Sequence, residues 1–221
     1  MEKTGSIVLV GDSAFAEVAF EYFTYDSPYD VVGFAVERNY RNRDVLLGLP
    51  VVDVETAESR FPPDRFGFHV ALTYKNLNRV RERLIGVMEG KGYASVSYLS
   101  SKAVVWPSAK LGKHHFIFEN NLVQPRTTIG DNCVLWSGNH IGHHTQIGNN
   151  CFIASHAVVS GFVRIGDHCF VGVNATVANN VTIGDDCIIG AGSLITQKTL
   201  PSETVSRPPR SALAPGAKAL M

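Results

Sequence analysis

A branched aliphatic residue occupies every sixth position from Leu99 to Ile195, and no insertion breaks this register. Glycine often follows the aliphatic residue, and a small residue usually stands four positions after it. One six-residue unit fits a short strand and a tight turn, but it cannot bury its aliphatic side chain alone. Three units that close a triangular coil place every eighteenth residue in a stack with a spacing of about 4.8 Å. The pattern therefore predicts a parallel β-solenoid of about five coils, each in contact only with its neighbours.

The cysteines follow the same register, because successive members are 18 residues apart. They are Cys133, Cys151, Cys169 and Cys187. No disulfide or zinc motif has this spacing. We interpret them as an inward ladder of small apolar side chains. The alternative is a reactive or disulfide-forming thiol.

The chain before the solenoid has a different pattern, in which short apolar runs alternate with amphipathic stretches. The pattern predicts strands over 7–10, 31–36, 51–52 and 69–73, and helices over 15–23 and 76–88. This alternation is typical of a small parallel sheet of Rossmann-like type. The predicted organisation is an α/β domain over 1–98, an all-β solenoid over 99–196 and a tail over 197–221.

The turn after the first predicted strand, Gly11-Asp12-Ser13, lies where a phosphate-binding loop would lie. The motif Gly-x-Gly-x-x-Gly is absent, however, and Asp12 puts negative charge where a phosphate would sit. Glu37, at the end of the second strand, could accept hydrogen bonds from a ribose or a base. These four residues are candidate substrate-binding residues, against the alternative of a helix-capping turn and a solvated acid.

Histidines gather in one stretch of the solenoid, where His140, His143, His144 and His156 stand close together. Acyl transfer from a thioester needs a base, and histidine is suited to this role because it titrates near neutral pH. The register stacks His143 against Gly161, whose amide would be an exposed donor for the oxyanion.

Two other interpretations of the histidines remain open. One is a metal site like that of the γ-class carbonic anhydrases, although the spacing of His140 and His144 fits it poorly. The other is structural, with histidines on turns that bind backbone groups. This second role is the one expected for three more histidines, His114, His115 and His168.

Charge and hydropathy narrow the classes of partner. The formal net charge is zero and the sequence pI is about 7.1, without the basic footprint of a nucleic-acid binder. No apolar stretch approaches the length of about 18 residues needed to span a bilayer. The N-terminal apolar run is too short for the core of a signal peptide. We therefore expect a cytoplasmic protein that binds neither nucleic acid nor membrane.

Taken together, the chain resembles the hexapeptide-repeat sugar acetyltransferases, a family of sialic acid O-acetyltransferases and of bacillosamine-precursor and perosamine N-acetyltransferases. The resemblance implies a left-handed β-helix after the Rossmann-like domain. The family's catalytic segment matches the stretch from Ile141 to Gly148, which puts the general base at His143. Acids flank the base in the family, whereas Gly142 and His144 flank it here. His143 and His144 are therefore the candidate catalytic residues.

The resemblance also implies that acetyl-CoA lies along the solenoid, between two subunits of a homotrimer. The family's cofactor contacts match Gly161, Val173 and Ala191. A family histidine near the cofactor aligns with Phe152, and His156 could replace it. The tail lacks the family's usual ending, but its cations could meet the cofactor phosphates. These cations are Arg207, Arg210 and Lys218.

The sequence thus predicts an acetyl-CoA-dependent acetyltransferase without a metal, acting on an amino or hydroxyl group of a nucleotide-linked sugar. A metal-dependent hydratase and a non-catalytic assembly solenoid are the alternatives. Trp136, Phe152 and Phe162 are expected on the outer face of the prism, as apolar surface that a neighbouring subunit would cover.

Overall fold

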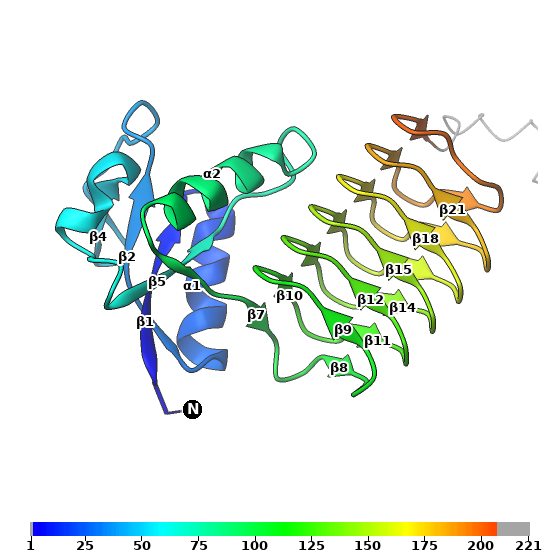
Figure 1. The fold of residues 1–221 in the computed structure, drawn as a ribbon, viewed down its shortest axis with the longest axis horizontal. Coiled ribbons are helices and arrows are strands. Elements are labelled where there is room, and N and C mark those ends of the chain that lie inside the picture. The colour runs from blue at the N-terminus through cyan, green and yellow to red at the C-terminus, as the bar shows by residue number, and fades with distance from the viewer. Residues whose placement is uncertain (1, 207–221) are drawn as a thin grey trace, which may run out of the picture.

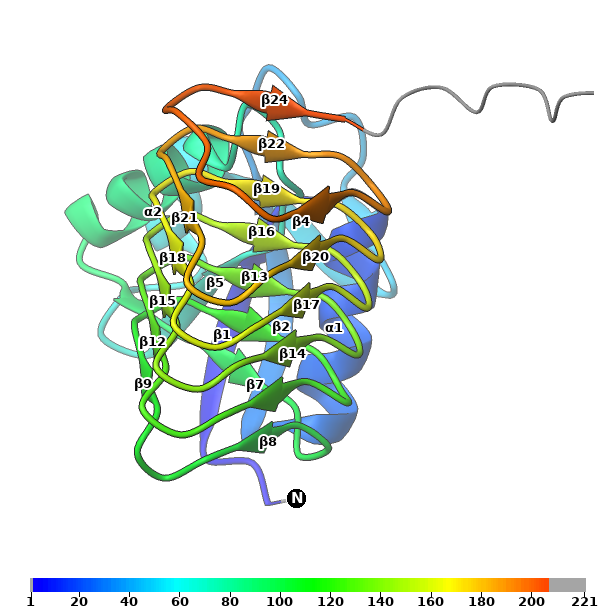
Figure 2. The same cartoon turned by 90° about the vertical axis from the view of Figure 1, so that its right-hand side faces the viewer.

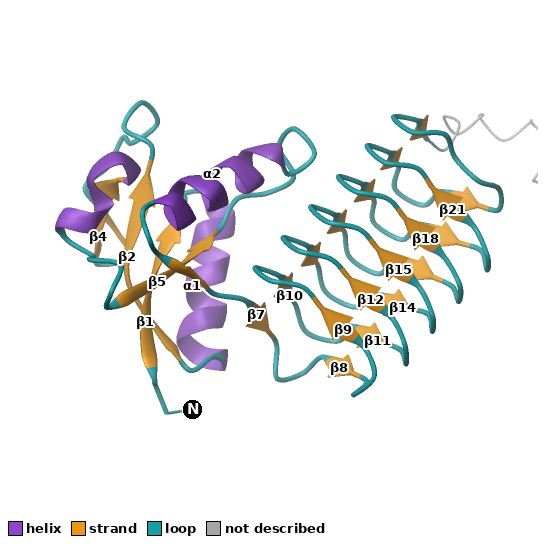
Figure 3. Cartoon of the chain, viewed as in Figure 1, coloured by secondary structure: helices purple, strands orange, loops and turns teal. Residues whose placement is uncertain are grey.

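The computed structural model of the protein describes residues 2–206. An α/β part is followed by a long stack of short strands (Figure 1), and every helix of the described chain lies in the first part (Figure 3). Within residues 2–206, neither α-helix combines the length and the apolar character that crossing a membrane requires. The predicted order, α/β first and solenoid second, is confirmed.

The α/β part is built on a sheet of order β3-β4-β2-β1-β5-β6, parallel except for β3. Its strands are β1 (Gly5–Val10), β2 (Tyr29–Val36), β3 (Val45–Leu46), β4 (Leu49–Asp53), β5 (Phe66–Val70) and β6 (Ala94–Ser95). Its helices are α1 (Ala14–Asp26), the 3-10 helix η1 (Val54–Ser59) and α2 (Arg79–Gly90). Apolar strands paired in parallel and flanked by helices form the expected Rossmann-like arrangement.

Two predicted elements of this part are shifted along the chain. The helix expected from residue 76 begins at Arg79, because the three residues before it have positive φ angles of 51°, 49° and 63°. Left-handed backbone cannot continue into a right-handed helix. The strand expected over 69–73 is β5, which starts earlier and pairs with β1 until Val70.

The solenoid has three parallel sheets, one on each side of a triangular coil (Figure 2). The first sheet holds β7 (Tyr98–Leu99), β10 (Phe116–Ile117), β13 (Val134–Leu135), β16 (Phe152–Ile153), β19 (Phe170–Val171), β22 (Ile188–Ile189) and β24 (Thr204–Val205). The second holds β8 (Val104–Val105), β11 (Leu122–Val123), β14 (His140–Ile141), β17 (Val158–Val159), β20 (Thr176–Val177) and β23 (Leu194–Ile195). The third holds β9 (Lys110–Leu111), β12 (Thr128–Ile129), β15 (Gln146–Ile147), β18 (Arg164–Ile165) and β21 (Thr182–Ile183).

The repeated aliphatic residues form the interior of the coils, as predicted. Ile141, Ile153 and Ile189 are completely buried, and the cysteines lie in the same cluster. All four cysteines are free thiols and are buried. Hydrogen bonds with the neighbouring Cys133 and Cys169 thiols, together with burial, raise the pKa of the Cys151 thiol. The predicted inward ladder is therefore confirmed.

Each side of the coil ends in a tight turn, and we name the turns after the first, second and third sheets the first, second and third corners. One residue in most of these turns is left-handed, with φ between 54° and 63°. At the second corner these residues are Arg126, His144, Phe162 and Asn180. Asparagine tolerates this conformation best among residues with a side chain. Asn120, Asn132, Asn150 and Asn174 take the corresponding place at the other corners.

The chain's own α/β part covers much of the outer face of the first sheet, whereas Ile188 of β22 is 37% exposed. The ring of Trp136 lies 5.4 Å from that of Phe15 on α1, and the ring of Phe152 lies 5.0 Å from that of Tyr74. The expectation that Trp136 and Phe152 are open to a neighbouring subunit is therefore wrong, because Phe152 is buried and Trp136 is half-buried against the α/β part. Phe162 remains 51% exposed.

A buried polar network joins the two parts at the third corner. Arg81 of α2 is fully buried, and its Nη1 and Nε donate to the Val70 carbonyl and to Asn132 Oδ1 at 2.6 and 3.0 Å. His114 Nε2 accepts the Val70 N–H at 3.0 Å. His115 Nδ1 and His168 Nδ1 lie 2.8 and 3.0 Å from backbone carbonyl oxygens. The structural role predicted for these three histidines is confirmed.

The ladder of the first sheet continues past residue 196. β24 pairs in parallel with β22, so residues 204–205 extend the solenoid within the segment that the sequence assigned to the tail. The predicted contacts of Arg207, Arg210 and Lys218 lie outside the described residues.

Candidate functional site

The second corner carries the histidines that the sequence singled out. His143 and His144 lie in the turn after β14, and Gly161 and Phe162 lie in the corresponding turn one coil later. The Phe162 N–H donates to the His143 carbonyl at 3.0 Å, and the His143 N–H donates to Gln124 Oε1 at 2.9 Å. Both histidine side chains are exposed. The turn is thus fixed through its backbone while the imidazoles face solvent.

The imidazole of His143 lies directly over Gly161, as the 18-residue register predicted. A Cβ on Gly161 would stand 2.8 Å from His143 Cε1 and 3.0 Å from Nε2. Only glycine leaves room for the ring in this position. The assignment of His143 as the base stays a prediction, but a base in this place is open to a substrate.

The amide of Gly161 differs from the expectation. We expected an exposed N–H, but it donates to Asn179 Oδ1 at 2.9 Å. Asn179 lies at the same corner one coil later, where the stacking brings its side chain beneath the turn. An oxyanion at this N–H would have to displace Asn179, so the idea of an unoccupied donor is wrong.

The side-chain partner of His143 is the neighbouring histidine, His144. The Nδ1 atoms of His143 and His144 lie 3.1 Å apart. The ring of His144 stacks on Phe162, with centroids 4.8 Å apart and an angle of 16°. The ring of Phe162 also meets His143 edge to face at 5.1 Å. The aromatic contact to Phe162 has no signal in the repeat pattern.

The other candidate cofactor residues lie at the first corner. Val173 is 45% exposed and Ala191 is also exposed, and the Gly192 N–H donates to the Val173 carbonyl at 2.7 Å. His156 lies at this corner too, where a Cβ on Gly138 would stand 2.6 Å from its ring. The second sheet separates this corner from His143. One chain therefore does not bring these residues together with the candidate base.

The candidate substrate residues of the α/β part gather at the carboxyl edge of its sheet. Gly11, Asp12 and Glu37 line a pocket of about 230 Å³, whereas Ser13, which precedes α1, is not among its lining residues. Gly11 has a φ of +125°, and a Cβ there would stand 2.8 Å from the Ala71 carbonyl oxygen. The Gly11 N–H donates to the Ala35 carbonyl at 2.8 Å, so it is not available to a phosphate.

Two cations at this pocket were not identified from the sequence. Arg83 of α2 binds both carboxylate oxygens of Glu37, at 2.9 and 2.8 Å. Lys75 also lines the pocket. Glu37 is therefore paired with Arg83 and is not a solvated acid, and its role toward a ribose or a base stays a prediction. The basic outer side of α2 was the signal in the sequence that could have found Arg83.

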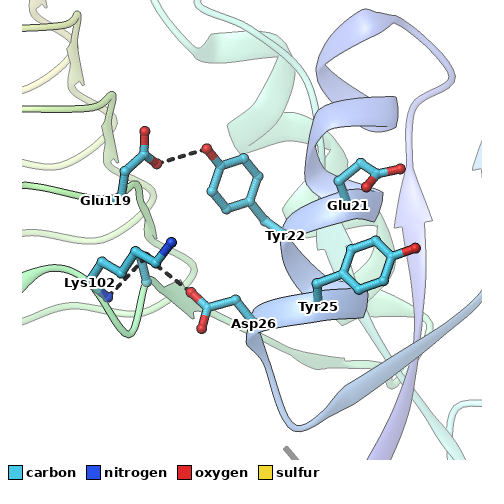
Figure 4. A pocket seen from close by; sticks show the side chains of 7 residues that line it. Glu21, Tyr22, Tyr25, Asp26, Lys102 and Glu119 are labelled. Atoms are coloured by element: carbon cyan, nitrogen blue, oxygen red, sulfur yellow. Dashed lines mark hydrogen bonds between the residues drawn. The ribbon is translucent and has the colours of Figure 1, made fainter.

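A larger pocket, of about 470 Å³, lies where α1 meets the first coil (Figure 4). Tyr22 Oη donates to Glu119 Oε2 at 2.7 Å across it, and burial and this carboxylate raise the pKa of Tyr22 to about 12. Asp26 accepts from Tyr98 Oη at 2.7 Å. The pocket contains none of the predicted site residues. In the described part of the chain, no three His, Cys, Asp or Glu side chains are placed to hold a metal ion.

Comparison with known proteins identifies the solenoid. The family described as bacterial transferase hexapeptide (six repeats) matches residues 126–161 and 162–197. The solenoid therefore carries this hexapeptide repeat over residues 126–197, and we call it the hexapeptide domain. No curated protein matches the sequence. The hexapeptide domain contains every candidate catalytic and cofactor residue named above.

Solved structures match both the α/β part and the hexapeptide domain. The acetyltransferase domain of PglB from Neisseria gonorrhoeae has a TM-score of 0.81 and 22% identity, covering 91% of this chain and 96% of that one. A mutant of perosamine N-acetyltransferase from Caulobacter crescentus, in complex with CoA and GDP-perosamine, has a TM-score of 0.81 and 25% identity over 91% and 92%. WeeI from Acinetobacter baumannii has a TM-score of 0.77 and 22% identity over 90% and 95%.

These matches confirm the predicted resemblance and its fold. The hexapeptide domain is a left-handed parallel β-helix preceded by a Rossmann-like α/β part, and the chain has the architecture of the sugar acetyltransferases. The predicted class, an acyltransferase, is confirmed with it. The PglB domain has also been solved with acetyl-CoA.

Proposed function

We propose that this acyltransferase moves the acetyl group of acetyl-CoA to an amino or hydroxyl group of a nucleotide-linked sugar, with His143 as general base. The observation that carries the proposal is the His143 imidazole, held over Gly161 on an exposed corner. The neighbours of the same architecture support the substrate classes, because the Caulobacter enzyme holds CoA and GDP-perosamine.

The reaction requires this chain to supply a proton acceptor beside the reacting carbonyl. The sugar nitrogen or oxygen attacks the thioester carbonyl, and His143 Nε2 takes the proton of the attacking group. The new C–N or C–O bond replaces the C–S bond, and the proton passes to the leaving sulfur. The products are the acetylated sugar and CoA. No covalent enzyme intermediate is needed, and the buried cysteines take no part.

The two halves of the cofactor site come together only if a neighbouring copy supplies one of them. His143 and Gly161 lie at the second corner, whereas Val173, Ala191 and His156 lie at the first. The outer face of the second sheet between these corners is mostly apolar, with His140 and Thr176 as its polar members. Val104, Val158 and Leu194 are 56%, 40% and 67% exposed there.

We infer a homotrimer in which this face is covered and each cofactor site lies between two subunits. Light scattering that gives the mass of a trimer supports this arrangement. A monomer mass at working concentration contradicts the shared cofactor site.

The sugar nucleotide belongs, in this proposal, at the carboxyl edge of the α/β sheet. Lys75 and Arg83 supply positive charge at the pocket, where ligands of open α/β sheets bind. A diphosphate there would draw Arg83 from Glu37 and leave the carboxylate for a ribose or a base. We propose that the reaction takes place in the cytoplasm, where buried cysteines stay reduced.

His143→Ala tests the proposal. Nucleotide-linked amino and hydroxyl sugars, GDP-perosamine among them, are screened as acceptors, and release of CoA is measured. The variant should lose activity by about 10²- to 10⁴-fold, the usual contribution of a general base. Gln146→Ala, on the exposed face of the next strand, is the matched control and should keep full activity. Full activity in a folded His143→Ala protein, or a wild-type protein that binds no acetyl-CoA by calorimetry, would refute the proposal.

A further inference from the structure

The structure places an imidazole where a catalytic histidine needs a partner. His143 Nδ1 and His144 Nδ1 lie 3.1 Å apart, a distance at which they share one proton. In a neutral imidazole one ring nitrogen donates and the other accepts. One of the two rings must therefore donate through Nδ1, and the other must accept at Nδ1.

The choice of donor decides whether His143 can act as a base. If His143 Nδ1 carries the shared proton, its Nε2 has a free electron pair. That nitrogen lies near the Gly161 position, 3.0 Å from where a Cβ would stand. If His144 donates instead, His143 carries its proton on Nε2 and cannot accept another. Only the first arrangement is productive.

We propose that His144 is a positioning residue that holds His143 in the Nδ1–H tautomer by accepting its proton, and that it does so only while it is uncharged. The inference rests on the proposed function and extends it to a residue that does not touch the substrate. A protonated His144 can only donate at Nδ1, so it would force His143 into the unproductive tautomer.

Phe162 fixes the geometry of this pair. The His144 ring lies flat on it, and the two imidazoles meet at an angle of 89°. His144 and Phe162 are both left-handed, with φ of 58°. The corresponding residue of most other turns has the same conformation, so it belongs to the coil geometry, and the ring contacts are what distinguish this pair. The aromatic support therefore holds the acceptor nitrogen of His144 toward His143.

Among residues 2–206, His144 is the one protein group placed to accept the proton of His143 Nδ1. Within residues 2–206, His144 is the hydrogen-bond partner of this nitrogen, and no carboxylate is paired with either ring. The charged groups on the adjoining coils are Arg126, one coil before His144, and Arg164, two residues after Phe162. Both are exposed cations, and neither can accept a proton.

Two substitutions at His144 separate the acceptor from the shape of the turn. His144→Phe keeps an aromatic ring at a left-handed corner, as Phe162 does, but removes the acceptor. His144→Asp supplies an acceptor that cannot donate while ionised, and Asp186 shows that aspartate takes this corner conformation at a φ of 59°. Asn120→Phe, at an exposed left-handed position of the first corner, is the control for the cost of phenylalanine there.

The expected kinetics follow from the tautomer. His144→Phe should lower kcat by about 10- to 100-fold with the KM for acetyl-CoA unchanged, less than the whole contribution of the base. His144→Asp should keep most of the activity. The acid limb of log kcat against pH should have a limiting slope of about two in the wild type and about one in His144→Phe, because only one histidine of the pair remains.

A measurement without substrate completes the test. Nitrogen-15 NMR of the full-length protein, with labelled histidine, should show His143 protonated on Nδ1 in the wild type and in His144→Asp. In His144→Phe the proton should move to Nε2. Wild-type kcat and pH profile in His144→Phe, with His143→Ala inactive, would overturn the positioning role alone. An active His143→Ala would instead overturn the proposed function. An Nε2–H tautomer at His143 in the neutral wild type also overturns the inference.

Discussion

Replacing Gly161 by alanine is the smallest change that should disable the candidate base without harming the fold. Gly161 does not have a positive φ, so its backbone accepts an L side chain. The new methyl group would stand 2.8 Å from Cε1 and 3.0 Å from Nε2 of His143. The atoms that must yield belong to an exposed side chain, which can swing toward solvent.

The size of the effect can be worked from these distances. Carbon atoms in contact prefer about 3.5–4.0 Å, so a ring now 2.8 Å from the methyl position must retreat by about 0.7–1.2 Å. A displacement of about 1 Å at a catalytic group can cost about 10²-fold in rate. That factor corresponds to about 2.7 kcal/mol of activation free energy. The free energy of unfolding should change little, because the displaced ring has no buried contact to lose.

The assay compares kcat for CoA release with the midpoint of urea unfolding in wild type and Gly161→Ala. Gly86→Ala is the control, because a Cβ at Gly86 meets nothing within 4 Å and the residue lies inside α2. That control should keep full activity and gain about 0.5–1 kcal/mol in stability. Wild-type kcat in Gly161→Ala would refute the reasoning that His143 works from its place over this glycine.

Two further outcomes concern stability and the thiols. Burial holds the pKa of His69, His114 and His115 below the usual value, so these rings stay neutral in the folded chain while the unfolded chain takes up protons near pH 6.5. The free energy of unfolding should therefore fall as pH drops below about 6.5. The decrease should be at most about 1.4 kcal/mol per pH unit for each histidine. A midpoint of urea unfolding that stays constant from pH 8 to pH 5 would contradict this. The four cysteines should react slowly with a thiol reagent in the native protein and fast in denaturant. The reason is that they are buried and that the pKa of the Cys151 thiol is raised. Rapid labelling of Cys151 in the folded protein would show that the inward cysteine ladder is wrong.

The repeat made the solenoid predictable in detail. Its aliphatic positions fix which side chains point inward, and an 18-residue period fixes which residues stack, so the place of His143 over Gly161 could be derived before any coordinates. The α/β part was predictable as a set of elements, since strands such as Ile7–Val10 read as short apolar runs. The left-handed stretch before Arg79 was not predictable, because Leu77 has no local preference for it and contacts with the solenoid impose it.

Several features of the site could not be predicted from the sequence. They depend on contacts that the 18-residue period of the repeat does not specify. Phe152 and Trp136 occupy outward positions of the repeat. The repeat pattern alone predicts that such positions face solvent, and it does not show that the α/β part packs against them. The bond from Arg83 to Glu37 joins a helix and a strand end 46 residues apart. Asn179 lies in register with Gly161, but nothing in the spacing says that its amide side chain turns back to the backbone.

The way the α/β part lies along the solenoid has a consequence for how the molecule comes apart. A free solenoid can fray coil by coil, since each coil contacts only its neighbours. Here side chains of the α/β part bind several coils along the solenoid. The hydrogen bonds are from Tyr22 to Glu119 and from Asn78 to the Asn150 carbonyl. Arg79 forms an ion pair with Asp186. One of these coils cannot open by itself without breaking its hydrogen bond or ion pair to the α/β part. The last strands, β23 and β24, pair with β20 and β22 and follow Asp186 in the chain, beyond these contacts. Amide exchange should therefore be slow and nearly uniform along the braced coils, and should accelerate abruptly in the final one.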